Sequence, residues 1–206
     1  MRSRLVHTIL GVAAVCGMYV AAGITTGAQA PLAVDSARIT ISGTSNIHAY
    51  TASTSTIRLT RGQLAGPLAG PDLWTNALKP GGVEAFEVSI PAATLTSPRE
   101  GLDKNMHKAL QVAEHPAITF RLVRLEAGAK PNALKAVGVL QIAGVEREIT
   151  LDVTTEHTGA TLGVKGQITM LMTDFGIKPP VAMLGMLKTD PKVTVTFETV
   201  LTVPLT

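Results

Sequence analysis

Most of the chain alternates hydrophobic and polar residues in short segments. Alternation with a period of two predicts β-strands that bury one face and expose the other. Residues 193–197 give the most regular example, Val-Thr-Val-Thr-Phe. The predicted strands lie at residues 38–42, 53–61, 84–90, 118–122, 135–142, 146–155, 162–172 and 193–197.

The segments between these strands carry turn and loop signals. Residues 143–145, Ala-Gly-Val, are short and contain a glycine, which predicts a hairpin between the flanking strands. Residues 62–82 are rich in glycine and proline and contain the single tryptophan, Trp74, so they are predicted to form a long connection.

One segment has helical spacing. Residues 98–112 place Leu102, Met106, Ala109 and Leu110 on one face at intervals of three and four. Ser97 and Pro98 suit the start of a helix. This segment predicts one short helical insertion.

These elements predict an all-β fold. One helix cannot cover both faces of a sheet of about eight strands, so the sheet must close on itself or fold into two layers. A barrel of about eight strands either fills its interior with side chains or holds one small ligand. The alternation is compatible with both a filled interior and an interior that holds a ligand. We take a closed, partly hollow antiparallel barrel as the working architecture.

The first thirty residues differ from the rest and have the layout of a secretory signal peptide. Arg2 and Arg4 precede an uncharged apolar stretch at 9–23, and the segment ends at Ala28-Gln29-Ala30. We expect residues 1–30 to be a signal peptide cleaved after Ala30, with an uncleaved anchor as the alternative. Cys16 lies inside the apolar stretch after a valine, which does not suit a lipid-anchoring cysteine.

Residues 31–206 would then form one exported domain, periplasmic or secreted. Removing two arginines leaves 16 Lys+Arg (18 − 2) against 15 Asp+Glu, a net charge of +1. That balance gives no basic surface for nucleic acid. The same domain would lack cysteine, so its stability must come from its core and its sheet. It has no further apolar run of membrane-spanning length.

Five blocks in order resemble the YceI-like family of exported lipid-binding proteins, over nearly all of residues 31–206. They are Ser42–Tyr50, Gly101–Leu110, Glu114–Phe120, Gly138–Val145 and Thr173–Ile177. The third resembles the family's histidine-proline-x-isoleucine-x-phenylalanine entry to a strand, and the fifth its Asp-Phe-Gly-Ile loop.

The resemblance implies an extended eight-stranded antiparallel lipocalin-like barrel without catalytic residues, whose interior holds a polyisoprenoid chain. Two departures concern the head-group end of the ligand. Thr173 stands where many members have an arginine, and the opening block lacks the tryptophan and the His-Ser pair of many relatives.

A long apolar ligand, such as a polyprenyl chain or a quinone tail, would be held by removing its surface from water. The apolar segment 175–187 is expected to be a lid or wall at the mouth, and His48 and Asp174 are candidate polar residues there. The candidate ligand-binding residues are Ile39, Ile41, Phe86, Val88, Met106, Phe120, Leu122, Leu140, Ile168, Met170, Phe175, Ile177, Met183 and Met186.

Other functions remain as alternatives. The first is an envelope accessory or interaction module with a filled core and an exposed apolar patch. The second is a lipid hydrolase, although the chain has no Gly-x-Ser-x-Gly elbow and no nucleotide-binding fingerprint. No cofactor is expected, and a metal site is not expected because His107 and Asp103 at helical spacing lack further ligands. The sequence does not determine the oligomeric state, and a homodimer is kept as an option.

Overall fold

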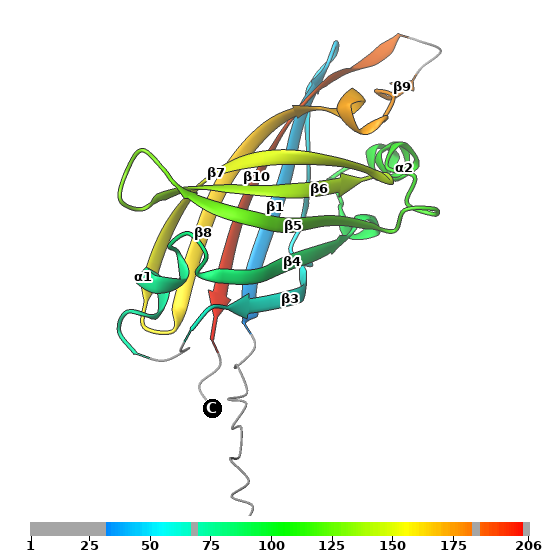
Figure 1. Cartoon of the computed structure of the whole chain (residues 1–206). Helices are drawn as coiled ribbons and strands as arrows, with labels where there is room; N and C mark the ends of the chain where they lie inside the picture. Colours follow the sequence, from blue (N-terminus) through cyan, green and yellow to red (C-terminus); the bar gives the residue numbers. More distant parts are fainter. Residues whose placement is uncertain (1–31, 67–69, 183–185, 204–206) are drawn as a thin grey trace, which may run out of the picture.

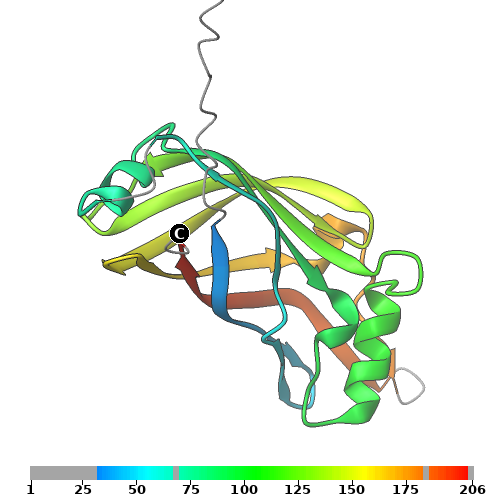
Figure 2. The same cartoon turned by 90° about the horizontal axis from the view of Figure 1, so that it is seen from below.

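The computed structural model describes residues 32–66, 70–182 and 186–203, which form a curled antiparallel sheet with a few short helices (Figures 1 and 2). The predicted signal peptide, residues 1–30, lies outside these ranges. The elements are β1 (Ala33–Ser45), β2 (Ala49–Thr54), β3 (Arg58–Leu64), α1 (Leu73–Ala77), β4 (Val83–Pro91), η1 (Ala92–Thr94), α2 (Glu100–Ala109), β5 (Ala117–Ala127), β6 (Ala133–Ile142), β7 (Val145–Thr158), β8 (Thr161–Leu171), η2 (Met172–Phe175), β9 (Val181–Ala182) and β10 (Leu187–Thr202).

The strands are ordered β2-β1-β10-β8-β7-β6-β5-β4-β3, and β9 pairs with β10. Figure 1 shows that β4, β5, β6 and β7 cross β1, β8 and β10 at a steep angle. β7 belongs to both halves, because its first part pairs with β6 and its last part, from Asp152 to Thr158, pairs with β8. The sheet therefore folds over itself and faces its own apolar side.

The end strands β2 and β3 share no ladder in the described chain, and β3 contacts β1. Residues 55–57 carry the chain from one to the other. Beside this join, the backbones of Ser53 and Thr96 form one antiparallel bridge, with N···O distances of 2.8 and 3.0 Å. We call this place, with the bridge, the seam.

A separate core cluster fills each end of the barrel. The α1 cluster consists of Leu32, Leu64, Leu73, Trp74, Ala77, Leu162, Leu201 and Val203. The α2 cluster consists of Ala92, Leu95, Ile118, Leu140, Ala143, Phe175 and Ile177, with side chains of α2 packed against it. The two helices lie at opposite ends of the molecule (Figure 1).

The predicted all-β antiparallel class is confirmed, with differences in detail. The sheet has ten strands rather than eight, partly because the predicted strand at 53–61 is divided into β2 and β3 at the seam. The predicted hairpin at 143–145 is a two-residue turn in which Ala143 and Gly144 have φ of 48° and 79°, as a type I′ turn requires. The predicted helix is present as α2.

The predicted long connection at 62–82 also contains a short helix, α1, which the sequence pattern did not predict. Leu73, Trp74 and Ala77 of α1 are buried because they fill the end of the barrel. No helix in the described ranges is long and apolar enough to span a membrane.

Candidate ligand-binding site

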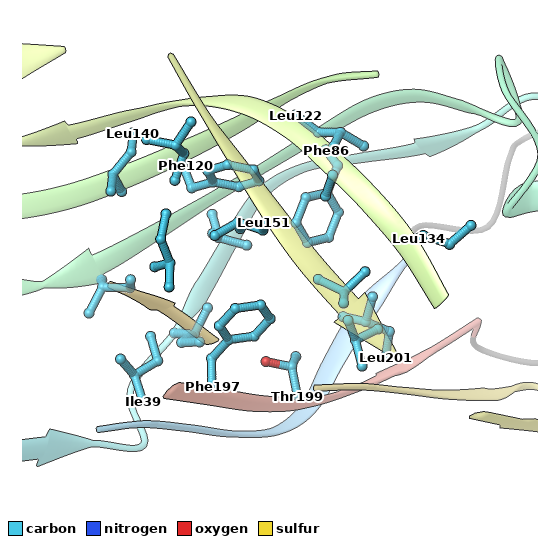
Figure 3. A pocket seen from close by; sticks show the side chains of 18 of the residues that line it. Ile39, Phe86, Phe120, Leu122, Leu134, Leu140, Leu151, Phe197, Thr199 and Leu201 are labelled. Carbon is cyan, nitrogen blue, oxygen red and sulfur yellow. The ribbon is translucent and has the colours of Figure 1, made fainter. Parts of the chain in front are cut away.

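The interior of the barrel holds a cavity of about 250 Å³ between the two clusters. Side chains from both halves of the sheet and from α1 line it, and Figure 3 shows them converging on the open space. The lining residues are Leu32, Ile39, Ile41, Ile57, Leu64, Trp74, Ala77, Leu78, Val83, Phe86, Val88, Ile90, Leu95, Ile118, Phe120, Leu122, Leu125, Leu134, Ala136, Leu140, Ile142, Ile149, Leu151, Val153, Thr155, Leu162, Val164, Ile168, Met170, Val195, Phe197, Thr199 and Leu201.

The lining follows from strand alternation. On β8, every second residue from Leu162 to Met170 faces the cavity, except that Gly166 has no side chain to do so. At about 3.4 Å of rise per residue, that stretch spans on the order of 27 Å of strand. The cavity walls are therefore long for the volume they enclose, a shape that suits a linear ligand.

Two glycines make room for aromatic rings in the wall. A Cβ at Gly138 would lie 2.4 Å from the ring of Phe120, and a Cβ at Gly166 would lie 2.6 Å from the ring of Phe197. Each ring therefore lies over the backbone of the neighbouring strand, at the position where glycine leaves no side chain. Phe120 and Phe197 both line the cavity, one from each half of the sheet (Figure 3).

The lining contains few polar atoms and, among the described residues, no ionisable side chain. Its polar members are Thr155, Thr199 and Trp74. Thr155 donates a hydrogen bond from Oγ1 to the carbonyl of Asn132 at 3.3 Å. The indole Nε1 of Trp74 is buried and has no hydrogen-bond partner.

The structure brings many of the candidate residues together around the cavity. Those that line it are Ile39, Ile41, Phe86, Val88, Phe120, Leu122, Leu140, Ile168 and Met170. Their contact with a ligand stays a prediction.

Other candidates lie away from the cavity. Phe175 and Ile177 are buried in the α2 cluster, and Met106 packs against the same cluster from α2. Met186 is 65% exposed. Met183 lies outside the described residues.

The segment 175–187, predicted to form a lid or wall at the mouth, contributes no described residue to the cavity lining. At Gly176, with φ of 69°, the chain turns after η2, and η2 packs against β7, β8 and β10. Phe175 and Ile177 fill the corner where β7 and β8 separate. Phe175 and Ile177 thus close one end of the barrel instead of lining the cavity.

The two candidate mouth residues also lie outside the cavity. His48 lies in a separate cleft between the β1–β2 turn and α2, where its Nε2 contacts Nη1 of Arg99. Asp174 is exposed on η2.

Tyr50 lies in the same cleft as His48 and is half-buried. Burial, and next the charge of Asp190, raise the pKa of Tyr50 above its ordinary value of 10.0. This is a local property of the cleft, since Tyr50 does not line the apolar cavity.

The remaining histidine and acidic candidates have structural partners. His107 donates from Nε2 to the carbonyl of Leu95 at 2.8 Å, and Asp103 accepts from the backbone of Ser97 at 2.8 Å. Within the described ranges, no three His, Cys, Asp or Glu side chains gather as a metal site would require.

Trp74 is a residue of the site that the sequence pattern did not predict. Its segment reads as a connection, because α1 is too short to show helical periodicity. A large aromatic side chain in a glycine- and proline-rich segment was the available signal, since tryptophan is seldom left exposed without a role.

Comparison with known proteins agrees with this architecture. The family model described as the YceI-like domain matches residues 32–201. None of the curated proteins matches the sequence.

Several solved structures share the fold at low sequence identity. BcnA of Burkholderia cenocepacia is 14% identical, with a TM-score of 0.62 over 80% of this chain and 95% of its own. A polyisoprenoid binding domain from Saccharophagus degradans is 13% identical, with a TM-score of 0.59 over 84% of this chain and 99% of its own. The Campylobacter jejuni YceI protein is 15% identical, with a TM-score of 0.52 over 70% and 82%.

Proposed function

The chain belongs to the YceI-like domain family, and from that membership we propose that it is an exported, non-catalytic protein that holds a long apolar lipid inside its barrel. The observation that carries the proposal is the continuous apolar wall around the cavity. The similar fold of a polyisoprenoid binding domain supports a ligand of the polyisoprenoid class, such as a polyprenyl chain or a quinone tail.

The energetics favour such a ligand. An apolar cavity of about 150 Å³ stays free of water and accepts benzene, and this one is larger at about 250 Å³. Each CH₂ group that leaves water gains about 0.8 kcal/mol. The lipid would gain affinity along its whole length without directional bonds.

The N-terminal sequence supports export. Residues 1–30 have the basic start, apolar core and Ala-Gln-Ala ending of a signal peptide. Cleavage after Ala30 would release the barrel domain into the periplasm or the medium.

The test is mass spectrometry of the protein purified from the envelope fraction of its own host, beside a mock purification. We expect a chain that begins at Pro31 and an enriched, nearly stoichiometric isoprenoid lipid in the organic extract. Protein that carries no lipid and also refuses added polyprenyl lipids would contradict the carrier function.

A pair of variants ties the lipid to the cavity. Leu151 on β7 lines the cavity, and its neighbour Thr150 is exposed on the opposite face. Leu151→Trp should fill the cavity and reduce the bound lipid at least tenfold, because overpacking has no room to relax beside a ligand. Thr150→Trp should retain the lipid, and equal retention by both variants would place the lipid elsewhere.

A specific observation favours a second candidate, the interaction module. Ile47, Val181 and Met186 are 59%, 61% and 65% exposed. The side chain of Asn46 donates to the carbonyl of Met186 at 2.8 Å, which holds Ile47 and Met186 in one region. If the purified protein carries no lipid, this region is where a protein partner should be sought.

A further inference from the structure

The α1 end of the cavity differs from the rest of its lining because it holds the polar side chains. Thr155 on β7 and Thr199 on β10 both pair with Val164 of β8, so the three residues form one row across the sheet. Val164 packs against the α1 cluster, to which Trp74 belongs. The remaining lining residues are apolar up to the α2 end.

Trp74 supplies an unused donor at this end. Its side chain is 2% exposed, yet its Nε1–H has no hydrogen-bond partner. Leaving a buried donor unsatisfied carries the full desolvation penalty of the group, so such donors are rare and need an explanation. Because Trp74 also lines the cavity, a cavity occupant is the natural acceptor.

The hydroxyl of Thr199 lies in the same row as Val164 and projects into the cavity (Figure 3). A hydroxyl can either donate or accept a hydrogen bond. The α1 end thus offers an indole donor and a hydroxyl group, while no described lining residue carries a charge.

We propose, resting on the proposed function, that the α1 end is a head-group subsite, in which Trp74 and Thr199 hydrogen-bond an uncharged oxygen of the bound lipid. The lipid then lies with its oxygen-bearing head at α1 and its hydrocarbon tail toward α2. A quinone carbonyl or an alcohol oxygen fits this chemistry. A phosphate or carboxylate head does not, because burying an unpaired charge in an apolar wall is costly.

The proposal is tested by binding three prenyl lipids of equal chain length to the mature protein, with a benzoquinone head, a plain hydrocarbon end and a phosphate head. The single tryptophan provides the signal, because its fluorescence reports on the proposed subsite alone. We expect the quinone to bind about tenfold more tightly than the hydrocarbon. This factor corresponds to the free energy gained when one buried donor forms its hydrogen bond. The phosphate should bind no better than the hydrocarbon.

Substitution assigns the difference to the subsite. Trp74→Phe keeps an aromatic ring and removes the N–H, and its binding is followed by lipid retention because the fluorescent residue is lost. It should abolish most of the preference for the quinone and leave hydrocarbon binding within about twofold. Thr199→Val, of nearly the same shape, should reduce the same preference and serves as a second variant if Trp74→Phe does not fold.

Each alternative outcome overturns the proposal. Equal binding of quinone and hydrocarbon, or an unchanged preference in both variants, would mean that a water molecule satisfies the indole, while the carrier function stands. Binding of none of the three lipids would remove the proposed function and this subsite with it.

Discussion

Tyr50 shows how one side chain reports on its surroundings. Its phenol is half-buried near Asp190, and burial followed by that charge raises its pKa above 10.0. The chain has two tyrosines, and Tyr19 precedes the proposed cleavage site. In the mature protein, the absorbance of the phenolate would therefore report Tyr50 alone.

We predict that the phenolate of Tyr50 appears above pH 10 in the folded protein. Because the unfolded chain ionises first, near pH 10, the free energy of unfolding should fall as the pH rises above that value. Tyr50→Phe should remove this part of the pH dependence. Asp190→Asn should lower the pH midpoint of phenolate formation only in part, since burial is the larger cause. A midpoint at or below pH 10 in the parent protein would contradict the assignment.

Among the strands, β8 shows how backbone space shapes the cavity wall. A Cβ at Gly166 would lie 2.6 Å from the ring of Phe197 and 2.8 Å from the carbonyl oxygen of Asp152. At Gly163, on the same strand, the nearest atom would be 3.5 Å away. The two glycines therefore form a matched pair of test positions.

Gly166→Ala should lower the free energy of unfolding by about 1–3 kcal/mol, because the ring of Phe197 must move against its packed neighbours. Gly163→Ala should change it by less than about 1 kcal/mol. Urea unfolding of both variants measures the difference. Equal effects would show that the ring of Phe197 has room to move.

Strand alternation predicted most of the elements and most of the inward-facing side chains. It placed Ile39, Phe86, Phe120 and Ile168 on the faces that line the cavity, because a strand buried on one face must alternate. The turn at Ala143 was also predictable, since its glycine marks a hairpin.

The ends of the barrel were not predictable from the same pattern. The α1 and α2 clusters fill corners that arise when the two halves of the sheet cross, and alternation within a strand carries no information about that crossing. Phe175 and Ile177 therefore read as ligand-facing residues although they fill a corner, and Trp74 read as part of a loop although it borders the cavity.

At the scale of the whole molecule, the seam is the place where the two end strands of the described sheet share no ladder. At the seam, one bridge between Ser53 and Thr96 joins β2 to the segment after η1. We expect a lipid to enter and leave through this place, because opening it breaks no strand ladder in the described chain.

A cross-link across the bridge tests that route. Residues opposite each other in a hydrogen-bonded antiparallel pair have Cα atoms about 5.5 Å apart, within the range of a disulfide. In Ser53→Cys/Thr96→Cys, the oxidised form should be about 3–4 kcal/mol more stable, for a closed loop of about 43 residues. Lipid exchange should slow at least tenfold and recover on reduction, and an unchanged rate in the oxidised form would place the route elsewhere.

The pairing of β1 with β10 also has a consequence for how the chain is assembled. Ala33, near the start of the described chain, lies opposite Thr202, near its end, and β10 also separates β1 from β8. Such distant pairing makes folding slow, since the loop between the partners must close before the contacts form. Until β10 has been synthesised, the β1–β2 pair and the sheet ending at β8 have no strand to join them. Both would present open edges that invite aggregation, so the growing chain needs protection until its last residues have been synthesised.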